Sequence, residues 1–146
     1  MTNPGFRIRP YQPSDEQSVI ALWQACNLVV PWNDPASDIR RKMQVNPELF
    51  LVGENDSGLV ATVMGGYEGH RGWANYLAVA PSHRRSGYGR IMMEAVEQRL
   101  KAMGCPKINL QVRESNAEVI RFYEDIGYKN DRVVSFGKRL IDDPPG

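Results

Sequence analysis

Residues 77–90 read Leu77-Ala78-Val79-Ala80-Pro81-Ser82-His83-Arg84-Arg85-Ser86-Gly87-Tyr88-Gly89-Arg90. The apolar run predicts a strand that ends near Pro81, and a short basic loop leads from it into the pattern of a long helix. A helix N-terminus carries unpaired backbone N–H groups and the positive end of the helix dipole, so it attracts anions. Gly87 and Gly89 place no Cβ between an anion and the backbone. The stretch therefore predicts a phosphate site, although Gly89 could equally serve close packing and the arginines could simply be solvated.

Hydrophobic periodicity on both sides of this stretch predicts an α/β protein. Helices are expected over residues 14–26, 34–46, 87–103 and 115–126. Strands are expected over residues 6–9, 49–54, 59–67, 73–80 and 107–112, and again from Tyr128 through Val133, Val134 and Phe136. The expected order is β-α-α-β-β-β-α-β-α-β-β. Hairpins in the first half imply antiparallel pairing and crossovers in the second half imply parallel pairing, so we expect a mixed sheet flanked by helices.

The composition excludes several classes of protein. The 146 residues, 42% of them hydrophobic, suit a single domain over residues 1–146. The 18 Lys and Arg against 17 Asp and Glu give a net charge of +1, which disfavours a nucleic-acid partner. The sequence has neither a membrane-spanning apolar run nor a signal pattern, so a cytoplasmic protein without a membrane partner is expected. Cys26 and Cys105 lack metal-ligand spacing, so we expect reduced, buried thiols and no metal.

Two segments carry a resemblance to a known family. Arg84-x-x-Gly87-x-Gly89, between a strand and a helix, resembles the signature of the GNAT superfamily of acyl-CoA N-acyltransferases. Residues 116–128, with Asn116, Tyr123 and the pair Gly127-Tyr128, resemble the later conserved segment of that family. The expected order of elements is similar to the GNAT fold, with its splayed central sheet, over essentially the whole chain. Segments 31–35, 64–72 and 137–141 are similar to those of a small bacterial acetyltransferase.

The resemblance implies that acetyl-CoA is the cosubstrate. The backbone of the last residues of the central strand would bind the acyl-pantetheine; these are Leu77, Ala78 and Val79. The pyrophosphate would lie on the loop and first helical turn, at Arg84, Arg85, Ser86, Gly87, Tyr88, Gly89 and Arg90. Asn116 would hydrogen-bond the cofactor, or cap its helix, or do both.

The resemblance also implies catalytic roles. Tyr123 would contact the cofactor and act as general acid on the leaving thiolate, whereas the alternative is a core tyrosine with a satisfied hydroxyl. The backbone N–H of Val79 would stabilise the oxyanion. Residues 73–79 contain no carboxylate to serve as base, in contrast to several family members. Glu68 in the preceding loop is the nearest candidate base, and its alternative is a solvated loop carboxylate.

The sequence leaves three candidate functions. The leading one is an N-acetyltransferase whose acceptor, a primary amine of a small molecule or a protein, attacks acetyl-CoA directly in a ternary complex. A non-catalytic acyl-CoA-binding or sensor module is the alternative, because the strand carboxylate is missing. A helix–turn–helix DNA-binding module is disfavoured by the charge balance. The resemblance also implies that residues 27–34, with Trp32, form part of the acceptor wall and that the exposed terminal strand over residues 133–140 could pair across a homodimer.

Overall fold

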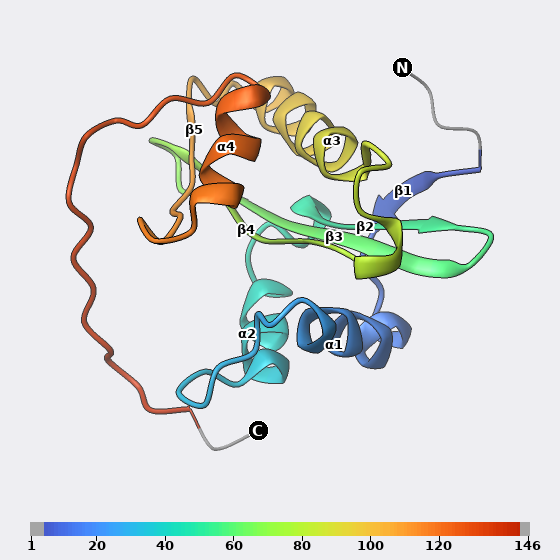
Figure 1. Ribbon diagram of the computed structural model, residues 1–146. Coiled ribbons are helices and arrows are strands. Elements are labelled where there is room, and N and C mark those ends of the chain that lie inside the picture. Colours follow the sequence, from blue (N-terminus) through green and yellow to red (C-terminus); the bar gives the residue numbers. More distant parts are fainter. Residues whose placement is uncertain (1–4, 144–146) are drawn as a thin grey trace.

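The computed structural model describes residues 5–143, and its centre is one five-stranded mixed sheet (Figure 1). The strands lie in the order β1-β2-β3-β4-β5. The first four pair antiparallel, and β4 pairs parallel with β5. Their bounds are β1 Arg7–Pro10, β2 Phe50–Asn55, β3 Gly58–Tyr67, β4 Gly72–Val79 and β5 Ile108–Asn109. The predicted mixed sheet is confirmed.

Helices cover both faces of the sheet (Figure 1). One face carries α1 (Glu16–Ala25) and α2 (Pro35–Lys42), and the other carries α3 (Tyr88–Ala102) and α4 (Ala117–Asp125). Single 3-10 turns lie at η1 (Pro13–Asp15), η2 (Pro47–Leu49) and η3 (Pro81–His83). The arrangement is a three-layer α/β architecture, in which each sheet face buries its apolar side chains against a pair of helices.

The alternation of side chains along β2 divides the core in two. Phe50 and Val52 pack with Trp23 in the cluster beneath α1 and α2. Leu51 packs with Met92 in the cluster beneath α3. Because successive strand residues point to opposite faces, an apolar run of this length predicts a strand that is buried on both sides.

A bulge interrupts the pairing of β3 with β4. Thr62 lies opposite Ala78 and Met64 lies opposite Asn75, so two residues of β4 face the single residue between them on β3. Tyr76 lies in this bulge with a φ of 52°. The Thr62 hydroxyl donates to the Tyr76 carbonyl at 2.9 Å and accepts from the Trp23 indole N–H at 2.9 Å. These buried bonds hold a backbone conformation that a non-glycine residue rarely adopts.

Beyond its first residues, β4 separates from β5. The two strands pair only at Gly72–Ile108 and Trp73–Asn109. The strand expected over residues 107–112 is therefore reduced to two residues. Bulges bend the strand that contains them, and the bend leaves the edge of β4 facing β5 open over residues 74–79 of the described chain.

The prediction of further strands from Tyr128 onward is wrong. Among the described residues, no strand forms after α4, and the order of elements ends β5-α4. Residues 128–143 form an extended arch outside the sheet (Figure 1), and the side chains of Val133, Val134 and Phe136 are 79%, 78% and 94% exposed. Apolar alternation produces a strand only where a backbone partner lies alongside. The two-residue β5 offers too short an edge for that pairing.

Candidate active site

The loop between β4 and α3 has the geometry of an anion site. Gly87 is the residue before the helix and has a φ of 84°, with no atom within 4 Å of the position that a Cβ would take. No side chain caps α3. The backbone N–H groups of its first turn therefore point out of the helix toward residues 84–87.

Three arginines surround this helix end. Arg84, Arg85 and Arg90 are exposed. Their guanidinium groups form no hydrogen bond or ion pair with another residue in the described range 5–143. Arg85 takes a φ of 64° at the tip of the loop. The helix dipole and three unpaired cations together favour a pyrophosphate here.

Two other residues of the predicted phosphate loop are fixed by protein contacts. The Ser86 hydroxyl donates to the His83 carbonyl. The Tyr88 ring is buried and stacks on Phe6 with centroids 4.0 Å apart, and its hydroxyl accepts from the Asn55 amide at 3.1 Å. Tyr88 is therefore left with only its backbone to offer an anion.

Gly89 has a packing role as well. A Cβ at this position would lie 3.0 Å from Phe122 Cζ and 3.2 Å from Phe122 Cε1. Because a real Cβ almost never approaches a ring so closely, Gly89 allows α3 and α4 to pack in contact. The alternative interpretation predicts close packing of helix on strand, but the tight contact is of α3 on α4, with Val79 on β4 at an ordinary 3.9 Å. The phosphate role stays a prediction.

The end of β4 presents backbone groups to the opening beside β5. Ala80 N–H donates to Val60 O on β3 at 2.8 Å. Since successive N–H groups of a strand point to opposite edges, the Val79 N–H points away from β3, into the space where β4 and β5 separate. Leu77 lies two residues earlier and faces the same edge, whereas Ala78 faces β3. An extended amide-bearing chain such as pantetheine can pair with this edge.

Tyr123 on α4 packs against the apolar cluster that also contains Leu77 and Val79. Its ring makes edge contacts with Phe122 and Tyr128, at centroid distances of 5.0 and 5.6 Å. Burial raises the pKa of Tyr123 to about 12. The hydroxyl forms no hydrogen bond within the part of the chain that the structure describes. A protonated, unpartnered hydroxyl suits a proton donor, although the raised pKa makes it a weaker acid than an exposed tyrosine.

Asn116 caps α4, because its side-chain oxygen accepts from Val119 N at 3.3 Å. The capping alternative is confirmed for this residue. Its side-chain N–H₂ group has no partner among residues 5–143, so a contact with the cofactor stays a prediction that the cap does not prevent.

Glu68 lies in the turn from β3 to β4, at the opposite end of β4 from Val79. Its exposed carboxylate accepts from the backbone N–H groups of His70 and Arg71. These bonds lower the pKa of Glu68, which makes it a weaker base. The structure gives Glu68 a role in closing the turn, and proton transfer from the end of β4 would have to pass through a chain of waters.

Sequence reasoning missed a polar cluster beside the bulge. The Asp38 carboxylate accepts from the Tyr76 hydroxyl at 2.6 Å, from the Arg41 guanidinium at 3.1 Å and from the Asn33 amide. Burial and Asp38 raise the pKa of Tyr76. The positive φ of Tyr76 arises from strand pairing, so no local sequence signal could have indicated the cluster.

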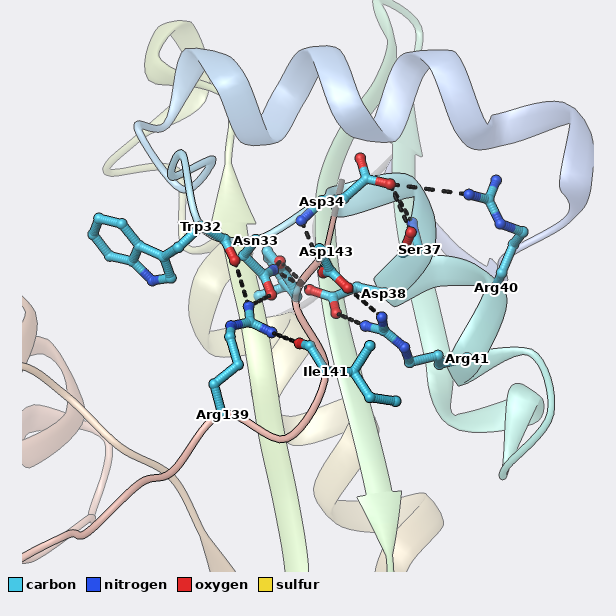
Figure 2. Close-up of polar contacts among 11 residues, drawn as sticks. Trp32, Asn33, Asp34, Ser37, Asp38, Arg40, Arg41, Arg139, Ile141 and Asp143 are labelled. Carbon is cyan, nitrogen blue, oxygen red and sulfur yellow. Dashed lines mark hydrogen bonds and ion pairs between the residues drawn. The ribbon is translucent and has the colours of Figure 1, made fainter. Parts of the chain in front are cut away.

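The end of the described chain closes over this cluster (Figure 2). Arg139 donates to the Trp32 carbonyl at 2.5 Å and to Asn33 Oδ1 at 2.9 Å. Asp143 accepts from Asp34 N at 3.0 Å and pairs with Arg41. The segment around Trp32, which is the expected acceptor wall, is thus hydrogen-bonded to Arg139 and Asp143 near the end of the described chain. The exposed Trp32 ring points away from the cluster (Figure 2).

The described residues 5–143 hold neither a cluster of metal-ligating side chains nor a membrane-spanning helix. They contain no group of three or more His, Cys, Asp or Glu side chains that could hold a metal ion. None of the helices described there is long and apolar enough to cross a membrane. Both cysteines are free and only partly buried, with Cys26 Sγ 3.3 Å from Val79 O and Cys105 Sγ 3.3 Å from Lys107 O.

Comparison with known proteins identifies relatives of this chain. The model of the acetyltransferase (GNAT) family matches residues 17–128. The Yersinia enterocolitica protein named acetyltransferase YE1169 is 49% identical over 138 residues, which cover 94% of this chain and 98% of that protein. The crystal structure of Ard1 from Thermoplasma volcanium matches with a TM-score of 0.75 and 27% identity, covering 84% of this chain and 82% of that one. The structure of AAC(6')-Iy with the bisubstrate analogue CoA-S-monomethyl-acetylneamine matches with a TM-score of 0.74 over 92% of this chain and 99% of that one, and at 16% identity it indicates a shared fold alone.

Proposed function

The chain belongs to the acetyltransferase (GNAT) family, and on that premise we propose that it transfers the acetyl group of acetyl-CoA to a primary amine of a small molecule or a protein. The observation that carries the proposal is the juxtaposition of two open backbone surfaces. The uncapped first turn of α3 follows, after the loop of residues 80–87, on the edge of β4 that has separated from β5. One surface suits a pyrophosphate and the other suits the pantetheine and thioester of the same ligand.

The phosphate end is held by the N–H groups at the start of α3 and by the side chains of Arg84, Arg85 and Arg90. Because all three arginines are exposed, each contributes a modest, salt-sensitive part of the affinity. The rigid backbone groups orient the cofactor. The side-chain N–H₂ of Asn116 is a further donor from the start of α4.

The thioester end is held by β4. The Val79 N–H donates to the carbonyl oxygen and stabilises the negative charge that develops when the amine attacks. Removing one such oxyanion donor typically lowers kcat about 10²- to 10³-fold. Leu77 N–H and C=O pair with the pantetheine amides along the same edge.

Tyr123 donates its hydroxyl proton to the sulfur as the carbon–sulfur bond breaks and free CoA leaves. Its unpartnered hydroxyl supports this role. The acceptor amine loses its proton to water, directly or through waters that reach Glu68. An α-amine, with a pKa near roughly 8, is partly unprotonated at neutral pH and needs little help from a base. Direct attack needs no acyl-enzyme, and neither Cys26 nor Cys105 is required as a nucleophile.

A non-catalytic acyl-CoA-binding module is the second candidate, because residues 73–79 contain no carboxylate base. The two candidates are separated by measuring CoA thiol release from acetyl-CoA in the presence of a broad panel of amines, together with CoA affinity by calorimetry. An acetyltransferase releases CoA in proportion to amine acetylated. The enzymatic proposal would be overturned if the protein binds CoA tightly but no amine accelerates the release of the CoA thiol above its spontaneous rate. That result would favour the binding module.

A further inference from the structure

A hollow of about 310 Å³ lies against the bulge of β4, lined by Asp38, Lys42, Met64, Asn75 and Tyr76. Asn75 and Tyr76 directly precede the residues that we assign to the thioester. At a rise of roughly 3.3 Å per residue, the backbones of Tyr76 and Asn75, which line the hollow, lie within about 10 and 13 Å of the Val79 backbone. A group bound in it would therefore be a neighbour of the reacting amine.

Lys42 is the unpaired charge of this hollow. The side chain is half-buried, and its Nζ lies 3.4 Å from the position of a Cβ at Gly66 on β3. The Lys42 ammonium makes no hydrogen bond or ion pair with the rest of the described chain, and Glu48, which influences it through space, is beyond ion-pair distance. Burial lowers the pKa of Lys42. A half-buried ammonium without a partner is costly, and an anionic ligand would offset that cost.

The neighbouring basic side chains of α2 are already paired. Arg40 lies 3.9 Å from the Asp34 carboxylate, and Arg41 bonds both Asp38 and Asp143. Among the basic side chains of α2, Lys42 is therefore the one without a partner in the described chain.

The acidic member of the hollow is satisfied by the protein. Asp38 accepts from Tyr76, Arg41 and Asn33, and the two carboxylates Asp38 and Asp143 are offset by Arg41, which bonds both, together with Arg139, which acts on Asp143 through space. What remains is the positive charge of Lys42. The hollow therefore favours an anion and disfavours a second cation.

We propose that the hollow binds a carboxylate or phosphate group of the acceptor through the Lys42 ammonium, so that the acceptors are small amines that carry an anionic group close to the amine. The inference rests on the proposed acetyl transfer and names the substrate class of that same site. The small volume favours a compact group. Polycationic amines are poor acceptors, because they place a like charge beside Lys42.

The test compares matched acceptors in wild-type protein and in Lys42→Met. Glycine is paired with glycinamide, phosphoethanolamine with ethanolamine, and spermidine represents polycations. We expect Lys42→Met to lower kcat/KM for glycine and phosphoethanolamine roughly 10- to 100-fold through KM, because a charge-assisted bond is lost. The kcat/KM for glycinamide and for ethanolamine should change less than about twofold, because these acceptors carry no anionic group for Lys42 to bind. Amine pKa differences within a pair cancel, since the readout is the change in each ratio on substitution.

Two further variants serve as controls. Lys42→Arg keeps the charge and should retain most of the preference for the anionic acceptor. Lys129→Met removes an exposed lysine outside the hollow and should change nothing. The phosphate and carboxylate pairs separate the two kinds of anion. An unchanged glycine-to-glycinamide and phosphoethanolamine-to-ethanolamine ratio in Lys42→Met, or a wild-type protein that prefers spermidine, would overturn the inference and leave acetyl transfer intact.

A binding measurement separates failure of the inference from failure of the proposed function. If no amine is acetylated, the proposed function fails, and saturation-transfer NMR with glycine and phosphoethanolamine decides the inference. Binding that is seen in wild-type protein and lost in Lys42→Met supports the anion site. Absence of binding to wild-type protein rejects it.

Discussion

Tyr123 illustrates how one residue acquires a chemical role from its surroundings. Its ring is held by apolar neighbours while its hydroxyl has no partner in the described chain. A core tyrosine usually satisfies its hydroxyl with a protein group. The exception marks the hydroxyl as available to a ligand.

Tyr123→Phe is expected to lower kcat about 10²- to 10⁴-fold, the range typical of a lost general acid. CoA affinity should be unchanged, because the ring and its packing remain. Steady-state rates and calorimetry measure the two effects. Tyr67→Phe, a tyrosine on β3, is the control. Full turnover by Tyr123→Phe would mean that the thiolate leaves without this acid.

Glu68 shows the opposite case. The sequence makes it the candidate base, but in the structure its carboxylate is engaged by backbone groups of its own turn. The carboxylate closes its own turn by accepting two backbone N–H groups. A glutamine retains one oxygen that can accept the same bonds.

Glu68→Gln is therefore expected to leave kcat within about twofold of wild type, whereas loss of a general base usually costs about 10²-fold or more. The measurement is kcat against pH with an acceptor of low amine pKa and one of high amine pKa. A loss of more than 10²-fold that is confined to the acceptor with the high amine pKa would assign Glu68 as the base, acting through water.

At the scale of elements, the bulge of β4 shapes the site. It separates β4 from β5, places Tyr76 beside Asp38 and turns the Val79 N–H toward the opening. Thr62 holds the bulge by joining Trp23 on α1 to the Tyr76 carbonyl. One buried hydroxyl thus connects a helix and two strands, one of which carries the edge that we propose to bind the thioester.

Thr62→Val is expected to destabilise the protein by about 1–3 kcal/mol, because it leaves the buried Trp23 N–H and the Tyr76 carbonyl without their partner. Urea unfolding measures this loss. The rate should fall as well, since the bulge positions Val79. Thr62→Ser keeps the hydroxyl and should retain the rate. Equal rates for the serine and valine variants would separate the bulge from catalysis.

At the scale of the whole molecule, the positive and negative charges nearly cancel, but unpaired basic side chains are concentrated in two places. The net charge is only +1. Yet Arg84, Arg85 and Arg90 lie unpaired at one helix end, and Lys42 lies unpaired in the hollow on the opposite face of the sheet. Asn75 and Tyr76 of β4 line the hollow, and the loop that carries Arg84 and Arg85 follows β4 in the chain.

Cofactor binding should reflect this arrangement in global stability. Acetyl-CoA is expected to raise Tm by mass action. The double variant Arg84→Ala/Arg85→Ala should weaken CoA binding roughly tenfold at low salt and less at high salt, because exposed charges are screened. Calorimetry at two salt concentrations measures the change, with Lys129→Ala as control. A salt-independent loss would mean that the arginines shape the loop instead of binding phosphate.

Much of the molecule follows from local sequence. Asp34 before Pro35 predicts the start of α2, and Asp34 does accept from Ser37 N at 3.2 Å. The run of residues 77–90 predicts a strand, a basic loop and a helix, and all three form. Caps, turns and periodicity act between residues close in the chain, so they can be predicted without knowledge of the fold.

Pairing between distant segments decided the rest. Residues 128–136 have the apolar pattern of a strand but remain unpaired in the structure, because no long strand edge lies beside them. The positive φ of Tyr76, the separation of β4 from β5 and the cluster of Asp38, Arg41 and Asp143 all depend on register and on contacts across the sheet. The sequence by itself therefore determined the four helices and the first four strands, and it predicts where an anion binds. Only the tertiary structure decided which backbone groups are left open and which cation lacks a partner, since both depend on neighbours that are far away along the chain.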